Sequence, residues 1–493
     1  MSVPIPSPAD RPRGLAALEQ RARFELDCLA YPARDWVPPR TYQGAPVHDA
    51  VVVGGGQSGV TIAFRLKREG VANVRVLDRN PAGLEGPWVT FARMHTLRTP
   101  KTVTGPDLGV ASLTVRAWWE AQHGARSWDE LGKIPREAWH DYLMWVRRVA
   151  GINLTNKAEV TDIEPLENGL FAVGATIDGR GETLIARNVV LATGIEGCGT
   201  WSVPPMIADA LPRASYAHTA DAIDFAALAG KRVAVLGAGA SAFDNAAMAL
   251  EAGAASVDLF ARRREMPTAN PNRWMEFAGF LRHFGDLDDG RKWRFMKRIF
   301  DVNQPPPQDT FERCAWFADF ALHLGAPLEE VAPNAGGGVR LTVPGATHDV
   351  DFLIVGTGFA VDLARRPELA RFAGEIALWR DKYQPPAGEA HAVLSGFPYL
   401  GDRFQFTEKE PGSAPFLKNV FSYTFAAMPS LAGSAGISAL KFGSERLTFG
   451  VTRNLFVEDA DAHLAALLAY DEPELDVAAA YRRVVPADAL SDS

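Results

Sequence analysis

Three glycines, Gly54, Gly56 and Gly59, form a G-x-G-x-x-G pattern directly after the apolar stretch HDAVVV. In this pattern the first glycine permits a tight turn, the second lets the backbone approach a pyrophosphate, and the third lets a helix pack on the strand. Gln57 and Ser58 would open that helix, whose free N–H groups and positive dipole end face the phosphates. The spacing therefore predicts a dinucleotide-binding loop.

An acidic residue stands where a second strand of the same unit should end. The stretch NVRVL runs into Asp78 and Arg79, and Asp78 follows Gly54 by 24 residues. A carboxylate at this place accepts hydrogen bonds from ribose hydroxyls. We therefore expect a nucleotide with free ribose hydroxyls here and count both residues in its site. A glycine-rich turn in an ordinary βαβ unit is the alternative.

The pattern recurs in VAVLGAGASAF, with Gly237 and Gly239 in the first two places and an alanine, which the fingerprint permits, in the third. Ala240 and Ser241 lie in this second loop. The strand that follows, SVDLFA, ends in three arginines, of which Arg262 and Arg263 are our candidates for ligand contacts.

Guanidinium groups bind a 2′-phosphate through charge-assisted hydrogen bonds, whereas an acid would repel it. The second site is therefore predicted to take NADP(H), and a solvated arginine loop is the alternative. Two sites in one chain suggest that FAD stays bound while NADPH visits.

The elements that position these loops predict an α/β fold with two Rossmann-like domains. NVVLATG at 188–194 and DFLIVGTGF at 351–359 are apolar stretches ending in glycine turns, one before and one after the second unit. This is how an FAD domain would look with an NADPH domain inserted into it. The expected limits are a 1–47 N-terminal arm, a 48–200 and 345–460 FAD-binding domain, a 201–344 NADPH-binding domain with a helical insert at about 265–330, and a 461–493 helical tail.

Bulk composition narrows the class of protein. The chain has 493 residues and a net charge of −8 without a long basic block, which disfavours nucleic acid as a partner. The three cysteines form no CxxC, which removes a dithiol redox centre, and the histidines show no ligand spacing, so no metal site is expected. No secretory signal or apolar run of 18 residues is present, so a cytoplasmic location without a membrane partner is expected.

Residues 48 to 460 resemble the two-dinucleotide-binding-domain flavoproteins, most of all the flavin-containing and N-hydroxylating (class B) monooxygenases. GLEGPW at 83–88 resembles the G-G-x-W turn of that group, and LATG and GTGF resemble its A-T-G-[FY] signatures. The resemblance implies cofactor contacts in the turn, at the adenine position, in the two signatures and at the last flavin-contacting helix: Gly86, Trp88, Val160, Thr193, Gly194, Gly358 and Gly436.

The segment FARMHTLRTPKTVTGPDLG, at 91–109, corresponds to the part of these enzymes that lies against the flavin. The resemblance offers Arg98, Lys101 and Asp107 as catalytic candidates. Arg98 would donate to the oxygenated flavin, since an anion there needs fixed donors, and Asp107 would orient the substrate or the nicotinamide amide. A phosphate-binding or surface arginine and a turn-capping aspartate are the alternatives.

The family motif between the two domains is only half present, because LPRASYAHTADAIDF keeps His218 but lacks the Phe, the Gly and the final aromatic residue. The resemblance implies an FAD-dependent, NADPH-using monooxygenase that oxygenates a small organic substrate with O2 through a flavin C4a-(hydro)peroxide. An NADPH-dependent reductase or dehydrogenase without oxygenation, or a non-catalytic redox-sensing flavoprotein, stays open. The substrate and the oxidised atom are not predicted, and a homo-oligomer is compatible with the sequence.

Overall fold

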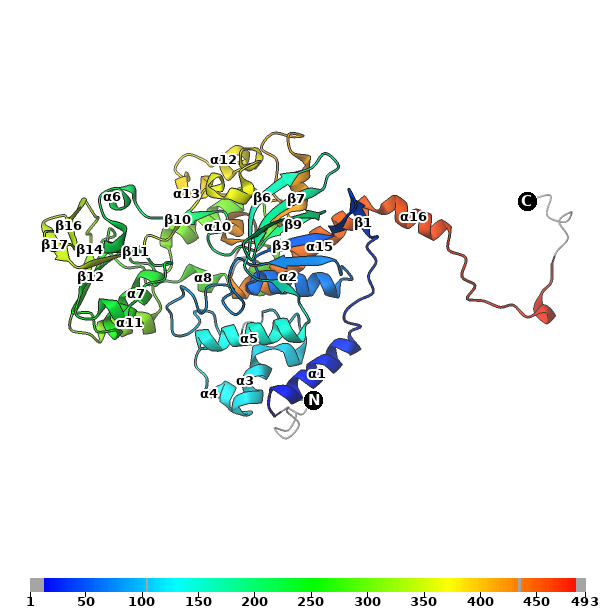
Figure 1. Ribbon diagram of the computed structural model, residues 1–493, viewed down its shortest axis with the longest axis horizontal. Helices are drawn as coiled ribbons and strands as arrows, with labels where there is room; N and C mark the ends of the chain where they lie inside the picture. Colours follow the sequence, from blue (N-terminus) through cyan, green and yellow to red (C-terminus); the bar gives the residue numbers. More distant parts are fainter. Residues whose placement is uncertain (1–12, 103–104, 433–435, 485–493) are drawn as a thin grey trace.

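The computed structural model describes residues 13–102, 105–432 and 436–484. Two lobes lie side by side in Figure 1, each built on an open parallel sheet. The sheet of the larger lobe has the order β20-β9-β3-β4-β5. Its strands are β3 (Ala50–Val53), β4 (Val74–Leu77), β5 (Leu154–Thr155), β9 (Val189–Leu191) and β20 (Val420–Ser422).

The smaller lobe repeats this plan with the order β11-β18-β12-β13-β14. Its parallel strands are β11 (Tyr216–His218), β12 (Arg232–Leu236), β13 (Ser256–Ala261), β14 (Phe320–Leu324) and β18 (Phe352–Val355). These strands read as continuous apolar runs because helices or a second sheet cover both faces. The lobes confirm the predicted fold class of two Rossmann-like units.

The strand β18 belongs to the sheet of the smaller lobe and not, as expected, to the FAD domain. The stretch 351–359 was assigned to the FAD domain, but β18 pairs in parallel with β11 and β12. The assignment of this strand, and with it the start of the FAD domain at 345, is therefore wrong. Each parallel sheet contains an apolar strand that runs into a glycine turn, β9 in the larger lobe and β18 in the smaller, so the local pattern did not distinguish between them.

Smaller antiparallel sheets complete both lobes. The larger lobe carries the sheet β1-β2-β8-β7-β6, and the smaller lobe carries β15-β16-β17. The chain passes between the lobes in a two-stranded sheet, β10-β19. The bounds are β1 (Arg40–Tyr42), β2 (Ala45–His48), β6 (Ala158–Pro165), β7 (Phe171–Ile177), β8 (Arg180–Ala186), β10 (Gly199–Trp201), β15 (Glu330–Pro333), β16 (Val339–Val343), β17 (Ala346–Val350) and β19 (Phe359–Val361).

Helices of the 265–330 region connect the two lobes. In α10 (Asp289–Val302), Trp293 is buried and lies 5.8 Å, ring centroid to ring centroid, from Trp379 of the larger lobe. In α11 (Gln308–Ala315), Phe311 packs instead on Phe243 of the smaller lobe. The insert therefore spans the boundary between the lobes, where a substrate pocket would lie.

The other helices surround these sheets, and the C-terminal segment leaves the larger lobe as an extended tail after α16 (Figure 1). Their bounds are α1 (Leu15–Cys28), α2 (Gln57–Arg68), α3 (Val115–His123), α4 (Ser127–Glu130), α5 (Arg136–Val149), α6 (Pro205–Ala208), α7 (Ala240–Glu251), α8 (Pro271–Trp274), α9 (Ala278–His283), α12 (Trp379–Lys382), α13 (Ala392–Ser395), α14 (Met428–Leu431), α15 (Leu440–Glu458) and α16 (Ala460–Leu468).

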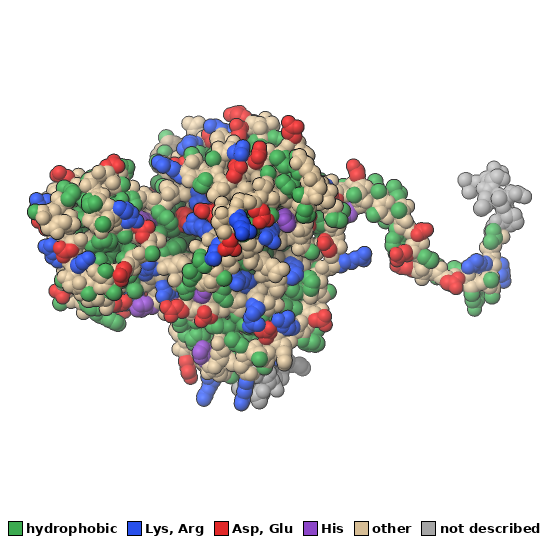
Figure 2. Space-filling view, in the orientation of Figure 1, with side chains coloured by type: hydrophobic (Ala, Val, Ile, Leu, Met, Phe, Trp, Pro, Cys, Tyr) green, Lys and Arg blue, Asp and Glu red, His purple; other side chains and the backbone are tan. Residues whose placement is uncertain are grey.

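Apolar side chains form one large core in the larger lobe and one on each face of the parallel sheet in the smaller lobe. Acidic and basic side chains are interspersed over the face seen in Figure 2. Among the described helices, none has the length and apolar character needed to cross a membrane.

Candidate nucleotide and substrate sites

Two glycines of the first glycine loop, Gly54 and Gly59, have no room for a Cβ atom. Gly54 has a φ of +105°, and a Cβ there would lie 2.4 Å from the carbonyl oxygen of Ala192. A Cβ on Gly59 would lie 1.8 Å from the carbonyl oxygen of Gly54. The N-cap of α2 is Gly56, which has no side chain to occupy the helix N-terminus. Gln57 and the buried Ser58 open the helix, so its first N–H groups face the space beyond the loop.

Asp78 ties the end of β4 to this loop. One carboxylate oxygen accepts from the Gly55 N–H at 2.8 Å and the other from the Asn80 N–H at 2.8 Å. Burial raises the pKa of Asp78 above its ordinary value, although both backbone hydrogen bonds oppose this shift. Each oxygen still has a free lone pair, which is what a ribose hydroxyl requires. Ala158 donates its N–H to the Asp78 carbonyl at 2.8 Å, which places β6 and its Val160 beside the acid.

Other predicted cofactor residues gather around the same loop. A Cβ on Gly56 would lie 3.6 Å from the Cα of Gly86, so the backbone of the tryptophan turn meets the glycine loop. Trp88 is buried, and its indole N–H finds no hydrogen-bond partner within the described residues. Thr193 and Gly194 follow β9, and the Gly194 carbonyl accepts from the Phe425 N–H at 3.4 Å. Side-chain-free backbone, an unpaired buried donor and a strand-end acid fit a bound FAD.

A carboxylate that the sequence interpretation passed over organises the tryptophan turn. Glu85 is 1% exposed and accepts hydrogen bonds from Arg147 at 2.6 Å and from Asn156 at 2.8 Å. The sequence offered one signal for this role, since Glu85 stands where the G-G-x-W turn of the family has a glycine. The neighbouring cofactor candidate Arg79 is paired with Glu196 at 2.8 Å.

The second glycine loop repeats the packing of the first. Gly237 has a φ of +115°, and a Cβ there would lie 2.3 Å from the carbonyl oxygen of Gly356. Gly239 is the N-cap of α7, and a Cβ on it would meet nothing within 4 Å. Ala240 and Ser241 open the helix, so its first N–H groups also face open space. Open space at a helix N-terminus suits a phosphate group.

The arginines after β13 carry charge that no side chain among the described residues neutralises. Arg262 is exposed and Arg263 half-buried, and neither side chain has a hydrogen bond or ion pair with the residues that the structure describes. The backbone at this point is held, because Gly325 donates its N–H to the Arg263 carbonyl at 2.7 Å. Two free guanidinium groups on a fixed backbone form a suitable site for an anion.

His218 belongs to the connection between the lobes. Its Nδ1 accepts from the Ala220 N–H at 3.1 Å, so the proton lies on Nε2, which donates to the Gly358 carbonyl at 2.9 Å. Burial lowers the pKa of His218 below its ordinary value. The ring also packs 5.3 Å from Trp201 of β10. Both ring nitrogens are therefore engaged by the backbone, and Gly358 shares this junction.

The three catalytic candidates lie apart in three environments. Arg98 forms an ion pair with the buried Asp244 of α7, across the boundary between the lobes. Lys101 donates to the carbonyls of Trp128 and Leu131 and thereby holds the end of α4. Asp107 accepts from the N–H groups of Gly105 at 3.0 Å and Gly109 at 2.9 Å, and burial raises its pKa. The catalytic roles of these residues stay predictions.

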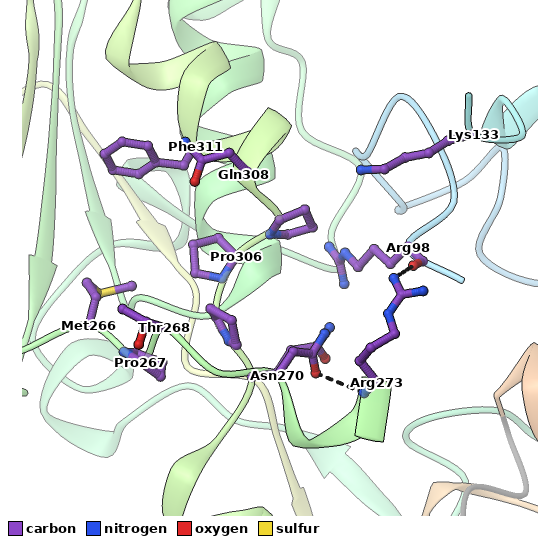
Figure 3. A pocket seen from close by; sticks show the side chains of 13 residues that line it. Arg98, Lys133, Met266, Pro267, Thr268, Asn270, Arg273, Pro306, Gln308 and Phe311 are labelled. Carbon is purple, nitrogen blue, oxygen red and sulfur yellow. Dashed lines mark hydrogen bonds between the residues drawn. The ribbon is translucent and has the colours of Figure 1, made fainter. Parts of the chain in front are cut away.

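Two cavities lie where the lobes meet, and Arg98 lines both. The larger, of about 590 Å³, is shown in Figure 3 and extends to the segment that follows the arginine loop. The smaller, of about 220 Å³, reaches Gly436 and the apolar side chains of Phe425 and Met428. Arg273 also lines both, and its Nη2 donates to the Arg98 carbonyl at 3.0 Å. The cavities together lead from the second nucleotide loop toward the last predicted flavin contact.

Comparison with known proteins agrees with this geometry. Residues 51–196 match an FAD-NAD(P)-binding family model, and residues 128–276 match the L-lysine 6-monooxygenase/L-ornithine 5-monooxygenase model. An ornithine hydroxylase from Pseudomonas aeruginosa shares the fold, with a TM-score of 0.64, 17% identity, and coverage of 83% of this chain and 100% of that one. An ornithine N-hydroxylase from Kutzneria sp. 744, solved with reduced FAD, NADP⁺ and L-ornithine, gives a TM-score of 0.63 at 17% identity and covers 83% of this chain and 99% of its own.

The fold and the paired nucleotide loops thus define a flavoprotein oxidoreductase of the two-domain monooxygenase class. An FAD-dependent urate hydroxylase from Xanthomonas campestris is 46% identical over 462 residues, which cover 93% of this chain and 97% of the relative. The chain belongs to the same family, that of the FAD-dependent hydroxylating monooxygenases. Its cofactors are FAD and a nicotinamide dinucleotide, NAD(H) or NADP(H), and its substrate is a small molecule.

Proposed function

We propose that the chain hydroxylates urate or a closely related planar, anionic purine, with NADPH as reductant and O2 as oxidant. The 46% identity to a urate hydroxylase along almost the whole chain carries this proposal. Two electrons come from NADPH, one oxygen atom enters the purine, and the second leaves as water. Bound FAD supplies the activation of oxygen, and the protein supplies binding, orientation and exclusion of water.

The cavities at the lobe boundary support an anionic heterocycle. Guanidinium groups of Arg98 and Arg273 stand on their walls, together with the amides of Asn270 and Gln304. A urate anion presents carbonyl oxygens and N–H groups around a flat ring, and such a ring is recognised by donors and acceptors at its edge. Phe425, on the wall of the smaller cavity, offers an apolar surface for the face of the ring.

Arg273 is the proposed cation for the substrate, and Glu276 the proposed acceptor. Glu276 Oε2 is buried and has no hydrogen-bond donor among the described residues, and it lies 3.6 Å from Arg273 Nη1. Burial raises the pKa of this carboxyl. A purine N–H would satisfy the oxygen that lacks a donor.

The remaining assignments are part of the same proposal. Gly54, Gly56, Gly59, Asp78 and Trp88 would hold FAD, and Gly237, Gly239, Arg262 and Arg263 would hold NADPH. Arg98 would position the two lobes while facing the cavity, and Lys101 and Asp107 would support the segment that carries it. We place the reaction in the cytoplasm, and a homo-oligomer is compatible with it.

Product analysis of the FAD-loaded enzyme tests this function directly. With NADPH and ¹⁸O2, we expect urate to be consumed one for one with NADPH and a single ¹⁸O atom to enter the product. Ornithine and lysine serve as comparison substrates and are expected to leave coupled turnover at background. Coupled hydroxylation of either amine, with urate inert, would contradict the proposal.

Substitution of Arg273 tests the proposed substrate contact. Arg273→Gln should lower kcat/KM for urate by ~10- to 100-fold, since a hydrogen bond to a charged group contributes about 1.5–3 kcal/mol. Anaerobic flavin reduction by NADPH should be unchanged. Arg291→Gln is the matched control, because Arg291 is exposed on α10 and, within residues 13–102, 105–432 and 436–484, forms an ion pair only with Asp288. Equal effects of the two variants on urate kinetics would remove Arg273 from the site.

A further inference from the structure

Two histidines and an aspartate meet in the smaller lobe, away from the cavities. Asp258 of β13, His323 of β14 and His348 of β17 offer ligand atoms that all lie within 4.8 Å of one another. His323 Nε2 lies 2.7 Å from Asp258 Oδ1. All three side chains are partly exposed. A dissolved ion can therefore reach the cluster, and none of its members takes part in the nucleotide or substrate sites.

The fold brings these residues together from distant parts of the sequence. His323 is the register partner of Phe260 across the parallel β13–β14 pair, and Asp258 lies two residues before Phe260 on the same face of the sheet. His348 comes from the three-stranded sheet that covers this face. The distance along the chain from Asp258 to His348 explains why no ligand spacing was visible in the sequence.

An aromatic ring holds both histidines in place. Phe260 is 2% exposed, stacks on His323 with ring centroids 4.6 Å apart, and contacts the edge of His348 at 4.9 Å. The two histidine rings are 5.1 Å apart. Rings restrained in this way lose little side-chain freedom when they bind an ion, which favours a preformed site.

We propose that Asp258, His323 and His348 form a binding site for a divalent transition metal ion of the zinc type. Imidazole nitrogens and one carboxylate oxygen are ligands that zinc accepts at about 2.0–2.2 Å, with water as the fourth ligand. Hard, oxygen-seeking ions such as magnesium are disfavoured by two nitrogen donors. The ion would bridge the parallel sheet and the sheet that covers it.

Metal binding also changes the tautomer of His323. The hydrogen bond between His323 Nε2 and Asp258 Oδ1 requires a proton between the two atoms, and an ion bound by both atoms takes its place. In a neutral ring the proton then lies on Nδ1, so binding involves neither a net release of a proton nor a redox change. A metal site here would also stabilise β14. The residue after this strand, Gly325, donates its N–H to the Arg263 carbonyl at 2.7 Å.

Equilibrium dialysis of the FAD-loaded, untagged protein against micromolar zinc tests the site, with bound metal measured by mass spectrometry. The wild-type protein should retain about one equivalent more zinc than His348→Ala or Asp258→Asn. Both variants should bind at least ~10-fold more weakly. Cobalt should give visible d–d bands in the wild-type difference spectrum, and these bands should be lost in both variants.

His283→Ala is the matched control, because His283 also lies 3.1 Å from an aspartate, Asp286, but on the larger-lobe side of the insert and outside any described three-ligand group. It should bind zinc as the wild type does. Two results would overturn the proposal: no zinc retained by the wild type, or equal retention by all four proteins. Because His348 and Asp258 are partly exposed, at least one of the two variants is expected to fold, and flavin content reports this directly.

Discussion

The two nucleotide loops have the same backbone packing and differ in the side chains at the end of the following strand. Each loop begins with a glycine of positive φ that a backbone carbonyl approaches closely. A Cβ atom on Gly54 would lie 2.4 Å from the Ala192 carbonyl oxygen, and one on Gly237 would lie 2.3 Å from the Gly356 carbonyl oxygen. After β4 the strand ends in the buried Asp78, which is tied to its own loop. After β13 it ends in the exposed Arg262 and the half-buried Arg263, whose side chains have no hydrogen-bond or ion-pair partner in the part of the chain that the structure describes.

We infer from this difference that the first loop holds a resident ligand and the second a visiting one. A buried acid bonded to the loop is part of a closed cradle, and a ligand that completes it is released slowly. Arginines at the surface attract a multiply charged phosphate, but water and salt weaken this attraction, so the phosphate can dissociate again. The first loop therefore suits FAD and the second NADP(H).

The largest effect should come from matched glycine substitutions. Gly54→Ala forces a Cβ against the Ala192 carbonyl, so the purified protein should be colourless or carry less than about a tenth of its FAD. Gly237→Ala forces the same clash in the second loop, so the protein should stay yellow while anaerobic reduction by NADPH falls at least ~10-fold. Absorbance spectra and stopped-flow reduction measure both outcomes.

Gly230→Ala separates the clash from the backbone strain. Gly230 also has a positive φ, +71°, but a Cβ there would meet nothing within 4 Å. This variant should keep both FAD and NADPH reduction close to wild type. If Gly54→Ala and Gly237→Ala lost the same function, the division between the loops would be wrong.

Removal of the arginine charges should have the next largest effect. Arg262→Ala combined with Arg263→Ala should raise KM for NADPH by ~10- to 100-fold and leave KM for NADH within about twofold, because only NADPH carries the 2′-phosphate. Steady-state kinetics with both nucleotides measure this. Arg340→Ala is the control, since Arg340 lies in the same lobe and pairs with Asp349 at 2.9 Å. A parallel loss with NADH would contradict the assignment.

A smaller effect is expected where the two lobes are joined by Arg98 and Asp244. Asp244 is buried and also accepts from Thr310 at 3.2 Å, so Arg98→Ala leaves it partly satisfied. We expect flavin reduction at saturating NADPH to fall about 10-fold, because nicotinamide and flavin must be aligned closely for hydride transfer. A double-mutant cycle with Asp244→Asn should show that the effects are not additive. Additive losses would mean that the pair does not align the lobes.

The smallest effect concerns an aspartate at the start of one parallel strand in each lobe, Asp49 before β3 and Asp351 before β18. Burial raises the pKa of Asp49, before β3, to about 7, whereas hydrogen bonds from Arg232 hold the pKa of Asp351 below its ordinary value. The folded protein thus keeps a proton on Asp49 that the unfolded chain releases near its ordinary pKa. Stability should therefore fall as pH rises from about 4 to about 7, by at most about 1.4 kcal/mol per pH unit.

Asp49→Asn removes this titration, so chemical denaturation across that pH range should show a flatter dependence than in the wild type. Asp351→Asn should leave the slope in this window unchanged, because the lowered pKa of Asp351 moves its own contribution below pH 4. A wild-type slope that survives Asp49→Asn would show that another group titrates there.

Local chemistry made the two loops predictable from the sequence. Gly54, Gly237, Asp78 and Arg262 owe their places to backbone and charge requirements that lie within one βαβ unit. The strand at 352–355 was misplaced because an apolar strand with a glycine turn occurs in both lobes, and only sheet pairing decides between them.

Long-range partners could not be predicted. Asp244 lies 146 residues from Arg98, so the ion pair between them leaves no trace in either local pattern. The carbonyl contacts of Lys101 and the cluster around His323 depend on tertiary packing in the same way. Glu85 was visible as a departure from the family glycine, but its two partners were not.

Anaerobic mixing of the purified protein with NADPH or NADH tests the central claim most directly. We predict that the yellow protein keeps its FAD through gel filtration and loses its colour on reduction with NADPH at least ~10-fold faster than with an equal subsaturating concentration of NADH. NADP⁺ should separate from the protein on the same column. A protein that arrives colourless and does not retain added FAD, or one reduced equally fast by both nucleotides, would contradict the account.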